Sequence, residues 1–342
     1  LWSLGSAIWH LCLNLSVGKM MKDEKQKIIS LLFLVVIFIP SLAFSVPPYS
    51  TEIRHKILVE KESIYNHILV YYSDRDRLVM GFKSKGAIYT ETEVDLQDLT
   101  NLTIQYTRLF MATLLFSPEP KNILMIGLGA GAMAQFLQYY YPNINIDLVE
   151  IDGDVVDIAK QHFALTETKN TKVHIQDGRV FVKKTKKKYD IVFLDAFRGS
   201  FVPFHLKTKE FYEEIKKVLT PNGVFASNLF KKSKLYPYDL QTFGAVFQNL
   251  YSFNGDGNSI LVAVHNDAIK VNKERILGIA KDLMKKKKFN FDFKYFADAF
   301  SRPPIPDKSI KYFTDDFAPV NFFNAVDERN GECFLCKYDT RN

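Results

Sequence analysis

A glycine-rich segment is the part of the sequence best suited to bind a ligand through its backbone. Gly127, Gly129 and Gly131 follow an apolar run at residues 123–126, and a helical pattern continues after them. Glycines between a strand and a helix let the backbone approach a ligand closely, and the helix N-terminus is locally positive. Such turns bind dinucleotides and also the nucleoside part of S-adenosylmethionine, so the glycines alone are weak evidence for either ligand.

Three carboxylates end the strands that are predicted next along the chain. Glu150 follows Gly127 at the spacing at which a carboxylate binds ribose hydroxyls in such folds, about 20 residues. Asp177 could accept from an adenine amine, and Asp195 could orient or deprotonate a reacting amine. Glu150 could instead only cap the helix after it. Ligands bind at the carboxyl ends of parallel strands, however, so four consecutive strand ends predict one crevice.

Strands that alternate with helices must position these residues. The expected strands are residues 123–126, 144–149, 172–175, 189–194 and 224–228. Their alternation with helical patterns predicts an α/β fold, a Rossmann-like doubly wound sheet that is mostly parallel. Residues after 236 are expected to finish the sheet with helices and an antiparallel pair.

The region before this sheet is predicted to be a small β-hairpin domain. Apolar and β-branched runs at residues 64–72, 78–82 and 87–90 indicate strands. A helix is expected at residues 99–115, where apolar residues recur at helical spacing until Pro118 stops it.

The order of the motifs resembles that of the spermidine synthase family, in its bacterial spermidine synthase-like branch. The segments that carry the resemblance are ESIYNHI at 62–68, ILMIGLGAG at 123–131, VEID at 149–152, QDGR at 176–179, YDIVFLD at 189–195, TKEFY at 208–212, LTPNGV at 219–224 and TDDFAPV at 314–320. The ordered set is much more specific than any one motif, and it spans about residues 52–323.

The resemblance implies transfer of an aminopropyl group from decarboxylated S-adenosylmethionine to a diamine or related amine. It implies Asp195 and Tyr106 as catalytic residues, with Tyr65 on the substrate side. The donor contacts that it implies are Gly127, Gly129, Gly131, Glu150, Asp152, Asp177 and Gly178.

The sequence also departs from the family's pattern. Ala130 stands where the family has a loop aspartate that contacts the donor's amino group, and Arg198 stands where a second aspartate helps to bind the diamine. Thr107 and Arg108 replace a histidine and a glutamate after the tyrosine. Arginines suit a carboxylate or phosphate rather than a dicationic substrate, so Arg198 is a candidate contact to a different substrate unless it points to solvent.

Two other functions therefore stay open beside aminopropyl transfer. One is a methyltransferase that uses S-adenosylmethionine itself, whose extra carboxylate an arginine could bind. The other is a non-catalytic protein that binds a nucleoside or a polyamine. A nicotinamide enzyme fits less well, because the loop lacks the last spacing of that fingerprint.

Residues 20–45 have the layout of a secretory signal peptide. A basic segment precedes the apolar run at 28–39, and small residues follow at Ala43 and Ser45. The run is short for a membrane span, although an uncleaved anchor is the alternative. Residues 1–19 precede the first methionine and are interpreted as an over-extended reading frame. We therefore expect an exported protein, periplasmic or secreted.

The remaining chain is expected to form an N-terminal β-rich domain with its connecting helix at 46–118, a donor-binding catalytic domain at 119–325 and a tail at 326–342. Cys333 and Cys336 lie in this tail, where a disulfide and the absence of any role are both open. A lone Cys-x-x-Cys has too few ligands for zinc, and we expect no metal site. A homodimer stays open.

The formal charge of +7 does not indicate a nucleic-acid surface. Much of it lies in lysine clusters at residues 183–188 and 285–288, and no aromatic residues alternate with the lysines as a stacking platform requires. Solvated helix ends or loops explain the clusters better. The expected partner is a small-molecule amine.

Overall fold

The computed structural model describes residues 56–84, 87–197, 202–304 and 309–317. The expected signal peptide, Arg198 and the cysteine pair lie outside these ranges. Within them, no helix is both long and apolar enough to cross a membrane.

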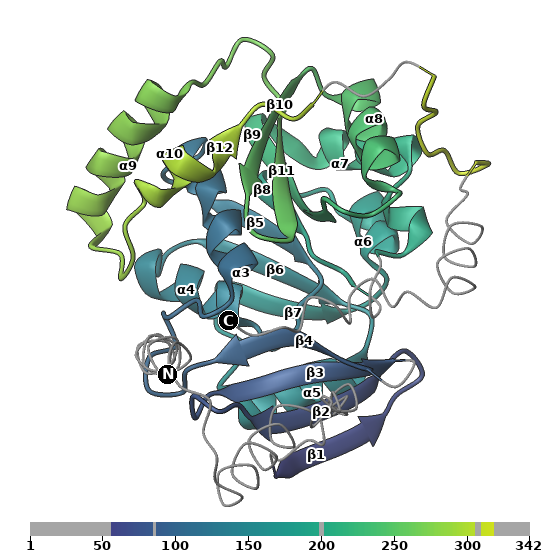
Figure 1. Cartoon of the computed structure of the whole chain (residues 1–342), viewed down its shortest axis with the longest axis vertical. Helices are drawn as coiled ribbons and strands as arrows, with labels where there is room; N and C mark the ends of the chain where they lie inside the picture. The colour runs from purple at the N-terminus through teal and green to yellow at the C-terminus, as the bar shows by residue number, and fades with distance from the viewer. Residues whose placement is uncertain (1–55, 85–86, 198–201, 305–308, 318–342) are drawn as a thin grey trace, which may run out of the picture. The chain divides into compact units, whose positions relative to one another are not determined.

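The larger sheet, sheet B, has eight strands within the described residues (Figure 1). Its strands, in spatial order, are β12 (Phe300–Ser301), β10 (Asn249–Asn254), β11 (Asn258–Val264), β9 (Leu219–Phe230), β8 (Tyr189–Leu194), β5 (Asn122–Ile126), β6 (Asn145–Glu150) and β7 (Thr171–Ile175). The strands from β9 to β7 are parallel, whereas β11, β10 and β12 add antiparallel to them. The predicted α/β fold with a mostly parallel sheet is confirmed.

Both faces of sheet B are buried, which explains the continuous apolar runs in its strands. In β5, Ile123 and Met125 pack into one core, and Leu124 and Ile126 pack into the other. The first core includes residues of α4 (Ala132–Tyr140), α5 (Gly153–His162), α9 (Lys273–Lys287) and α10 (Tyr295–Ala299). The second includes residues of α6 (Gly178–Lys184), α7 (Lys209–Val218) and α8 (Tyr236–Val246).

Sheet A is a smaller antiparallel sheet formed by the first part of the described chain. Its strands follow the order of the sequence, β1 (Ile57–Glu62), β2 (His67–Tyr72), β3 (Leu78–Ser84) and β4 (Ala87–Val94). The register shifts between β3 and β4, because Met80 faces Thr92 whereas Gly81 faces Thr90. Glu91 is therefore the extra residue of a β-bulge, a feature that re-aims side chains next to active sites.

The helix expected at residues 99–115 is shorter than predicted. The structure has α3 at Gln105–Phe110, followed by a 3₁₀ turn, η1, at Met111–Leu115. Before it, the Asp98 carboxylate accepts hydrogen bonds from the amide and hydroxyl of Thr100. Such local side-chain bonds compete with helix formation. Residues 99 and 100 form a turn, and Leu102 forms a single bridge with Val94 of β4, so the helix begins only at Gln105.

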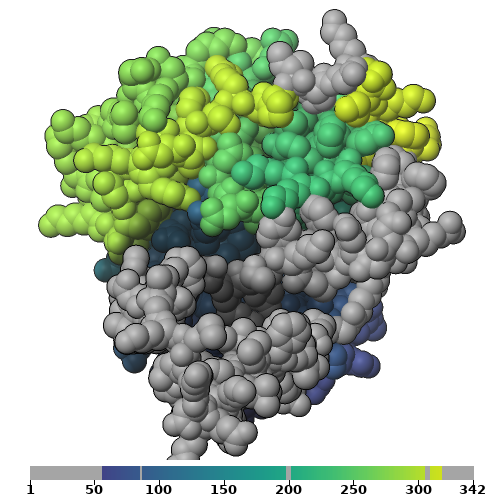
Figure 2. Space-filling view, viewed as in Figure 1, coloured from purple at the N-terminus to yellow at the C-terminus, as the bar shows by residue number. Residues whose placement is uncertain are grey.

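Both lysine clusters lie at helix ends, as predicted. Lys183 and Lys184 are in the last turn of α6, and the last turn of α9 contains residues 285–287. Cations there interact favourably with the negative end of the helix dipole. In the space-filling view, α9, α10 and β12 (light green to yellow) form one continuous surface (Figure 2).

Candidate active site at the strand ends

A cavity of about 510 Å³ lies at the carboxyl ends of β5, β6 and β8. Both sheets contribute to its wall. The predicted site residues that line it are Tyr65, Tyr106, Gly127, Gly129, Glu150, Asp177, Gly178 and Asp195. Gly131 is not among the lining residues and is the N-cap residue of α4 instead, at a φ of 83°.

The glycine loop has a conformation that only glycine adopts without strain. Gly127 has a φ of 94°, and a Cβ there would overlap the carbonyl oxygen of Asp195. Gly129 has a φ of 53°, and a Cβ there would overlap the hydroxyl of Thr92. The Thr92 hydroxyl accepts a hydrogen bond from the amide of Ala130 (3.0 Å). Sheet A is thus in direct contact with the glycine loop.

Glu150 is fixed by the backbone on both sides of its carboxylate. One oxygen accepts from the amide of Leu128 (3.0 Å), and the other accepts from the amide of Asp152 (3.0 Å). Burial raises the pKa of Glu150, although these hydrogen bonds oppose the shift. Each oxygen retains a lone pair, so the pair can still accept from two ribose hydroxyls.

Asp152 is not among the residues that line the cavity, so its expected role as a donor contact stays a prediction. It is the N-cap of α5 and accepts from the amide of Asp154 (3.1 Å). It also accepts from Ser63 Oγ (2.5 Å) and from Asn66 Nδ2 (3.0 Å), both in the turn between β1 and β2. Its carboxylate therefore joins sheet A to sheet B.

Asp177 is the N-cap of α6 and faces a histidine that the sequence did not indicate. One oxygen accepts from the amide of Val180 (2.9 Å), and the other lies 2.7 Å from His205 Nε2. His205 lies in the short turn η2 (Phe204–Leu206) and lines the cavity. The pair forms one wall of the site, next to Gly178.

Asp195 follows β8 and is held by an amide relay. Asn258 Nδ2 donates to Asn228 Oδ1 (2.7 Å), and Asn228 Nδ2 donates to Asp195 Oδ1 (3.1 Å). The relay fixes the orientation of the Asn228 amide. Burial raises the pKa of Asp195 to about 6, and hydrogen bonds from Asn228 and Tyr106 oppose the rise.

Tyr106 connects Asp195 to sheet A. Its hydroxyl donates to the carbonyl oxygen of Glu91 (2.9 Å) and also interacts with the carboxylate of Asp195. It carries one proton, so it can donate to one of them at a time. Burial and the neighbouring carboxylates raise the Tyr106 pKa well above its usual value, so the phenol stays protonated.

The described wall of the cavity is acidic rather than basic. Its carboxylates are Glu91, Glu150, Asp177 and Asp195. Among the described lining residues, none is lysine or arginine. Thr107 lines the cavity as a neutral residue, and Arg108 is not among the lining residues. Arg108 therefore adds no positive charge to the described wall, and Arg198 lies outside the described residues.

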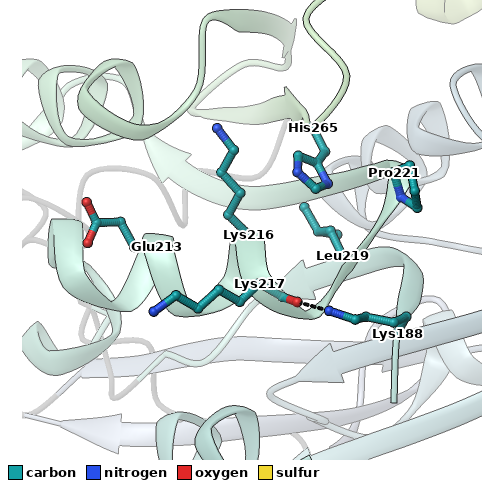
Figure 3. A pocket seen from close by; sticks show the side chains of 7 residues that line it. All are labelled: Lys188, Glu213, Lys216, Lys217, Leu219, Pro221 and His265. Atoms are coloured by element: carbon teal, nitrogen blue, oxygen red, sulfur yellow. Dashed lines mark hydrogen bonds between the residues drawn. The ribbon is translucent and has the colours of Figure 1, made fainter. Parts of the chain in front are cut away.

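A second hollow, of about 650 Å³, lies at the opposite ends of β8 and β9 (Figure 3). Two of its lysines donate hydrogen bonds to carbonyl oxygens at the ends of helices. Lys188 donates to the carbonyl oxygen of Lys217, in the last turn of α7. Lys216 donates to the carbonyl oxygen of Val246, at the end of α8 (3.0 Å). None of the predicted site residues lines this hollow.

Four residues of the site were missed from the sequence. They are Glu91, Thr92, His205 and Asn228. Asn228 could have been found, because it lies on the strand next to β8 and near the same edge. The other three depend on a bulge and on a loop, which have no periodic signal.

Comparisons with known proteins agree with this arrangement. The spermine/spermidine synthase domain matches residues 104–254. A polyamine aminopropyltransferase of Vibrio vulnificus is 32% identical over 299 residues, covering 84% of this chain and 97% of that protein. A probable spermidine synthase of Corynebacterium glutamicum has the same fold, with a TM-score of 0.61 at 19% identity over 78% of this chain and 99% of that one.

A human protein of another kind shares part of the fold. Methyltransferase-like protein 13, in complex with SAH, has a TM-score of 0.51 at 26% identity, over 54% of this chain and 93% of that one. The match to the Vibrio protein extends over almost the whole of that relative. This chain therefore belongs to the spermine/spermidine synthase family, the polyamine aminopropyltransferases.

Proposed function

We propose that this chain transfers the aminopropyl group of decarboxylated S-adenosylmethionine to a primary amine, with Asp195 as the group that orients the amine and accepts its proton. The observation that carries the proposal is the position of the Asp195 carboxylate. It lies in the same cavity as the glycine loop and the ribose-binding candidate Glu150. Family membership supplies the class of reaction.

The acidic wall favours the decarboxylated donor. That donor carries a sulfonium and an ammonium group, and its acceptor is also a cation. Opposite charges within about 4–6 Å stabilise each other, whereas a buried like charge is costly. S-adenosylmethionine has an additional carboxylate, for which the described wall offers only His205 as a basic partner.

The reaction that fits the site is a direct displacement. Glu150 and the glycine loop hold the ribose, and the pair of Asp177 and His205 lies where an adenine amine can donate. The lone pair of the acceptor nitrogen forms a bond to the carbon next to the sulfonium, and the carbon–sulfur bond electrons return to sulfur. Methylthioadenosine leaves, and Asp195 accepts the proton from nitrogen. Positioning and proton transfer account for the catalysis.

A methyltransferase is the second candidate. Its support is the partial likeness to human methyltransferase-like protein 13, which was solved with SAH. In that case the carboxylate of S-adenosylmethionine would lie at the end of the ligand away from the adenine, where the described wall offers no lysine or arginine. The acidic wall of the described cavity argues against this alternative.

The deciding experiment incubates the purified full chain with either donor and a panel of diamines, and identifies the products by mass spectrometry. We expect methylthioadenosine together with an aminopropylated amine. Formation of S-adenosylhomocysteine would show instead that the protein is a methyltransferase. If neither product forms although the protein binds methylthioadenosine, a binding role would be favoured.

We also propose that the chain is exported, on the signal-peptide layout at residues 20–45. Fractionation of cells that express the full chain tests this directly. Mature protein that begins near residue 46 in the exported fraction is the expected result, and full-length protein that stays in the cytosol would contradict it.

A further inference from the structure

Glu91 enters the cavity because of the bulge in β4. Neighbouring residues of a regular strand point to opposite faces, yet Glu91 and Thr92 both line the cavity. The bulge permits this, because Thr92 faces Met80 and Thr90 faces Gly81, which leaves Glu91 unpaired between them. The carbonyl of Glu91 is tied to the Tyr106 hydroxyl (2.9 Å), so the bulge is fixed to the helix that follows sheet A.

The Glu91 carboxylate differs from the other acids of the wall. Three of them, Glu150, Asp177 and Asp195, already accept the hydrogen bonds described above. Within the described residues, no hydrogen bond or ion pair forms with the Glu91 carboxylate. It is partly buried and lies in the field of Asp195 and Glu150. Burial and these two charges raise the Glu91 pKa well above its usual value.

No lysine or arginine is among the described residues that line the cavity with Glu91. A cationic ligand would therefore stabilise the charged form of the Glu91 carboxylate. The next residue, Thr92, contacts the loop at Ala130, where the side chain is a methyl group that cannot bind an ammonium. Suppose that Glu150 holds the ribose of the donor and that the reacting carbon lies beside Asp195. The amino group of the donor then still needs a partner. Of the four acids, only Glu91 is free to receive it.

We infer that Glu91 binds the ammonium of the donor's aminopropyl chain and thereby selects the decarboxylated donor. This inference rests on the proposed function. S-adenosylmethionine carries a carboxylate on the same carbon as its ammonium, so Glu91 would face a like charge as well as a cation. Selection of this kind uses a repulsive contact in addition to an attractive one.

The test compares Glu91→Gln with the wild type by calorimetric binding of three ligands: decarboxylated S-adenosylmethionine, S-adenosylmethionine and methylthioadenosine. Glutamine keeps the shape of the side chain and removes its charge. Glu93→Gln is the matched control, because Glu93 lies on the same strand, pairs with Arg77 (3.1 Å) and does not line the cavity.

We expect Glu91→Gln to raise the Kd of the decarboxylated donor roughly 10- to 100-fold, the effect of losing one charge-assisted hydrogen bond. Methylthioadenosine lacks the aminopropyl chain, so its Kd should change less than about twofold, which also shows that the pocket is folded. The preference for the decarboxylated donor over S-adenosylmethionine should shrink by a similar factor. Glu93→Gln should resemble the wild type.

Equal losses for the decarboxylated donor and methylthioadenosine would overturn the inference. So would an unchanged donor Kd with a raised KM for the acceptor amine, which would assign Glu91 to the acceptor. In both cases the wild type still prefers the decarboxylated donor, and the proposed function stands. Wild-type protein that prefers S-adenosylmethionine would overturn the inference and the proposed function together.

Discussion

The hydroxyl of Thr92 accepts a hydrogen bond from the buried amide of Ala130, so sheet A supplies a partner that the glycine loop cannot supply itself. The loop turns at Gly127 and Gly129 with positive φ, which leaves the Ala130 amide outside the ladder of sheet B. Because an unpaired buried amide is costly, sheet A and the loop should be stable together rather than separately.

Thr92→Val tests this contact. Valine has the shape of threonine but accepts no hydrogen bond, so the amide of Ala130 is left unpaired. We expect the free energy of unfolding to fall by about 1–3 kcal/mol in urea denaturation, with weaker binding of methylthioadenosine. Thr92→Ser is the control, because it keeps the hydroxyl. A valine variant as stable as the serine variant would show that packing, and not the hydrogen bond, is what matters.

Gly127→Ala should disrupt the site from the backbone outwards. A Cβ at this residue overlaps the carbonyl of Asp195, and its φ of 94° is strained for alanine. We expect a loss of about 1–3 kcal/mol in stability and a large loss of turnover, because Asp195 must move. Gly244→Ala is the control, since an exposed position in α8 has no atom within 4 Å of its Cβ. Helix propensity predicts that Gly244→Ala is neutral or up to about 1 kcal/mol more stable.

The sequence predicted the fold because its strongest signals are local and periodic. Apolar runs flanked by glycine, asparagine or aspartate mark β5, β6 and β8, and both faces of these strands are buried. The position of Asp195 follows from the rule for strand ends alone. The prediction of a helix at 99–115 was wrong in its first part, because the hydrogen bonds from Thr100 to the Asp98 carboxylate compete with helix formation there.

The parts of the site that escaped prediction depend on tertiary structure. Glu91 reaches the cavity through a bulge, and a one-residue shift in register has no signature in the order of apolar residues. His205 lies in the short turn η2, whose course is set by the packing around it. Asp152 was assigned to the donor by resemblance, whereas its contacts to Ser63 and Asn66 require both sheets to be in place.

Arg179 should stabilise the contact of the last described segment, residues 309–317, in a manner that depends on pH. It forms hydrogen bonds of 2.7–2.9 Å with both Glu214 and Asp315. The Arg179 guanidinium lowers the pKa of Asp315. The stabilisation is therefore present above about pH 4, the usual aspartate value, and is lost as the pH falls further.

We expect Arg179→Gln to lower the free energy of unfolding by about 2 kcal/mol at pH 7, less than for a fully buried pair. The difference from the wild type should shrink below about pH 4. Arg75→Gln, in the exposed turn after β2, is the control and should change little. A difference that stays constant in urea denaturation from pH 7 to pH 3 would contradict the role of the ion pairs.

Asp195→Asn should abolish turnover and leave nucleoside binding intact. Asparagine has the same shape and can keep a contact with Asn228, but it cannot accept a proton. We expect kcat to fall at least about 100-fold, while the Kd of methylthioadenosine stays within about twofold. In the wild type, the decline of kcat/KM should steepen below about pH 6, the pKa of Asp195. The variant should lack this inflection, and full activity in the variant would remove Asp195 from its catalytic role.

The same pKa gives Asp195 an effect on stability of the opposite sign to that of Asp315. Burial raises the pKa of Asp195 to about 6 from the usual 3.8, so the folded state holds its proton more tightly than the unfolded state does. The contribution of this group is greatest below about pH 4 and is lost as the pH rises through about 6. Asp195→Asn removes that loss, so the variant should gain stability over the wild type between about pH 4 and 7. Glu150 and Glu91 also have raised pKa values, so the pH profile of the variant should flatten without becoming level. Thermal unfolding of both proteins across this range measures the difference, and a gap that is independent of pH would show that Asp195 is not the group that titrates.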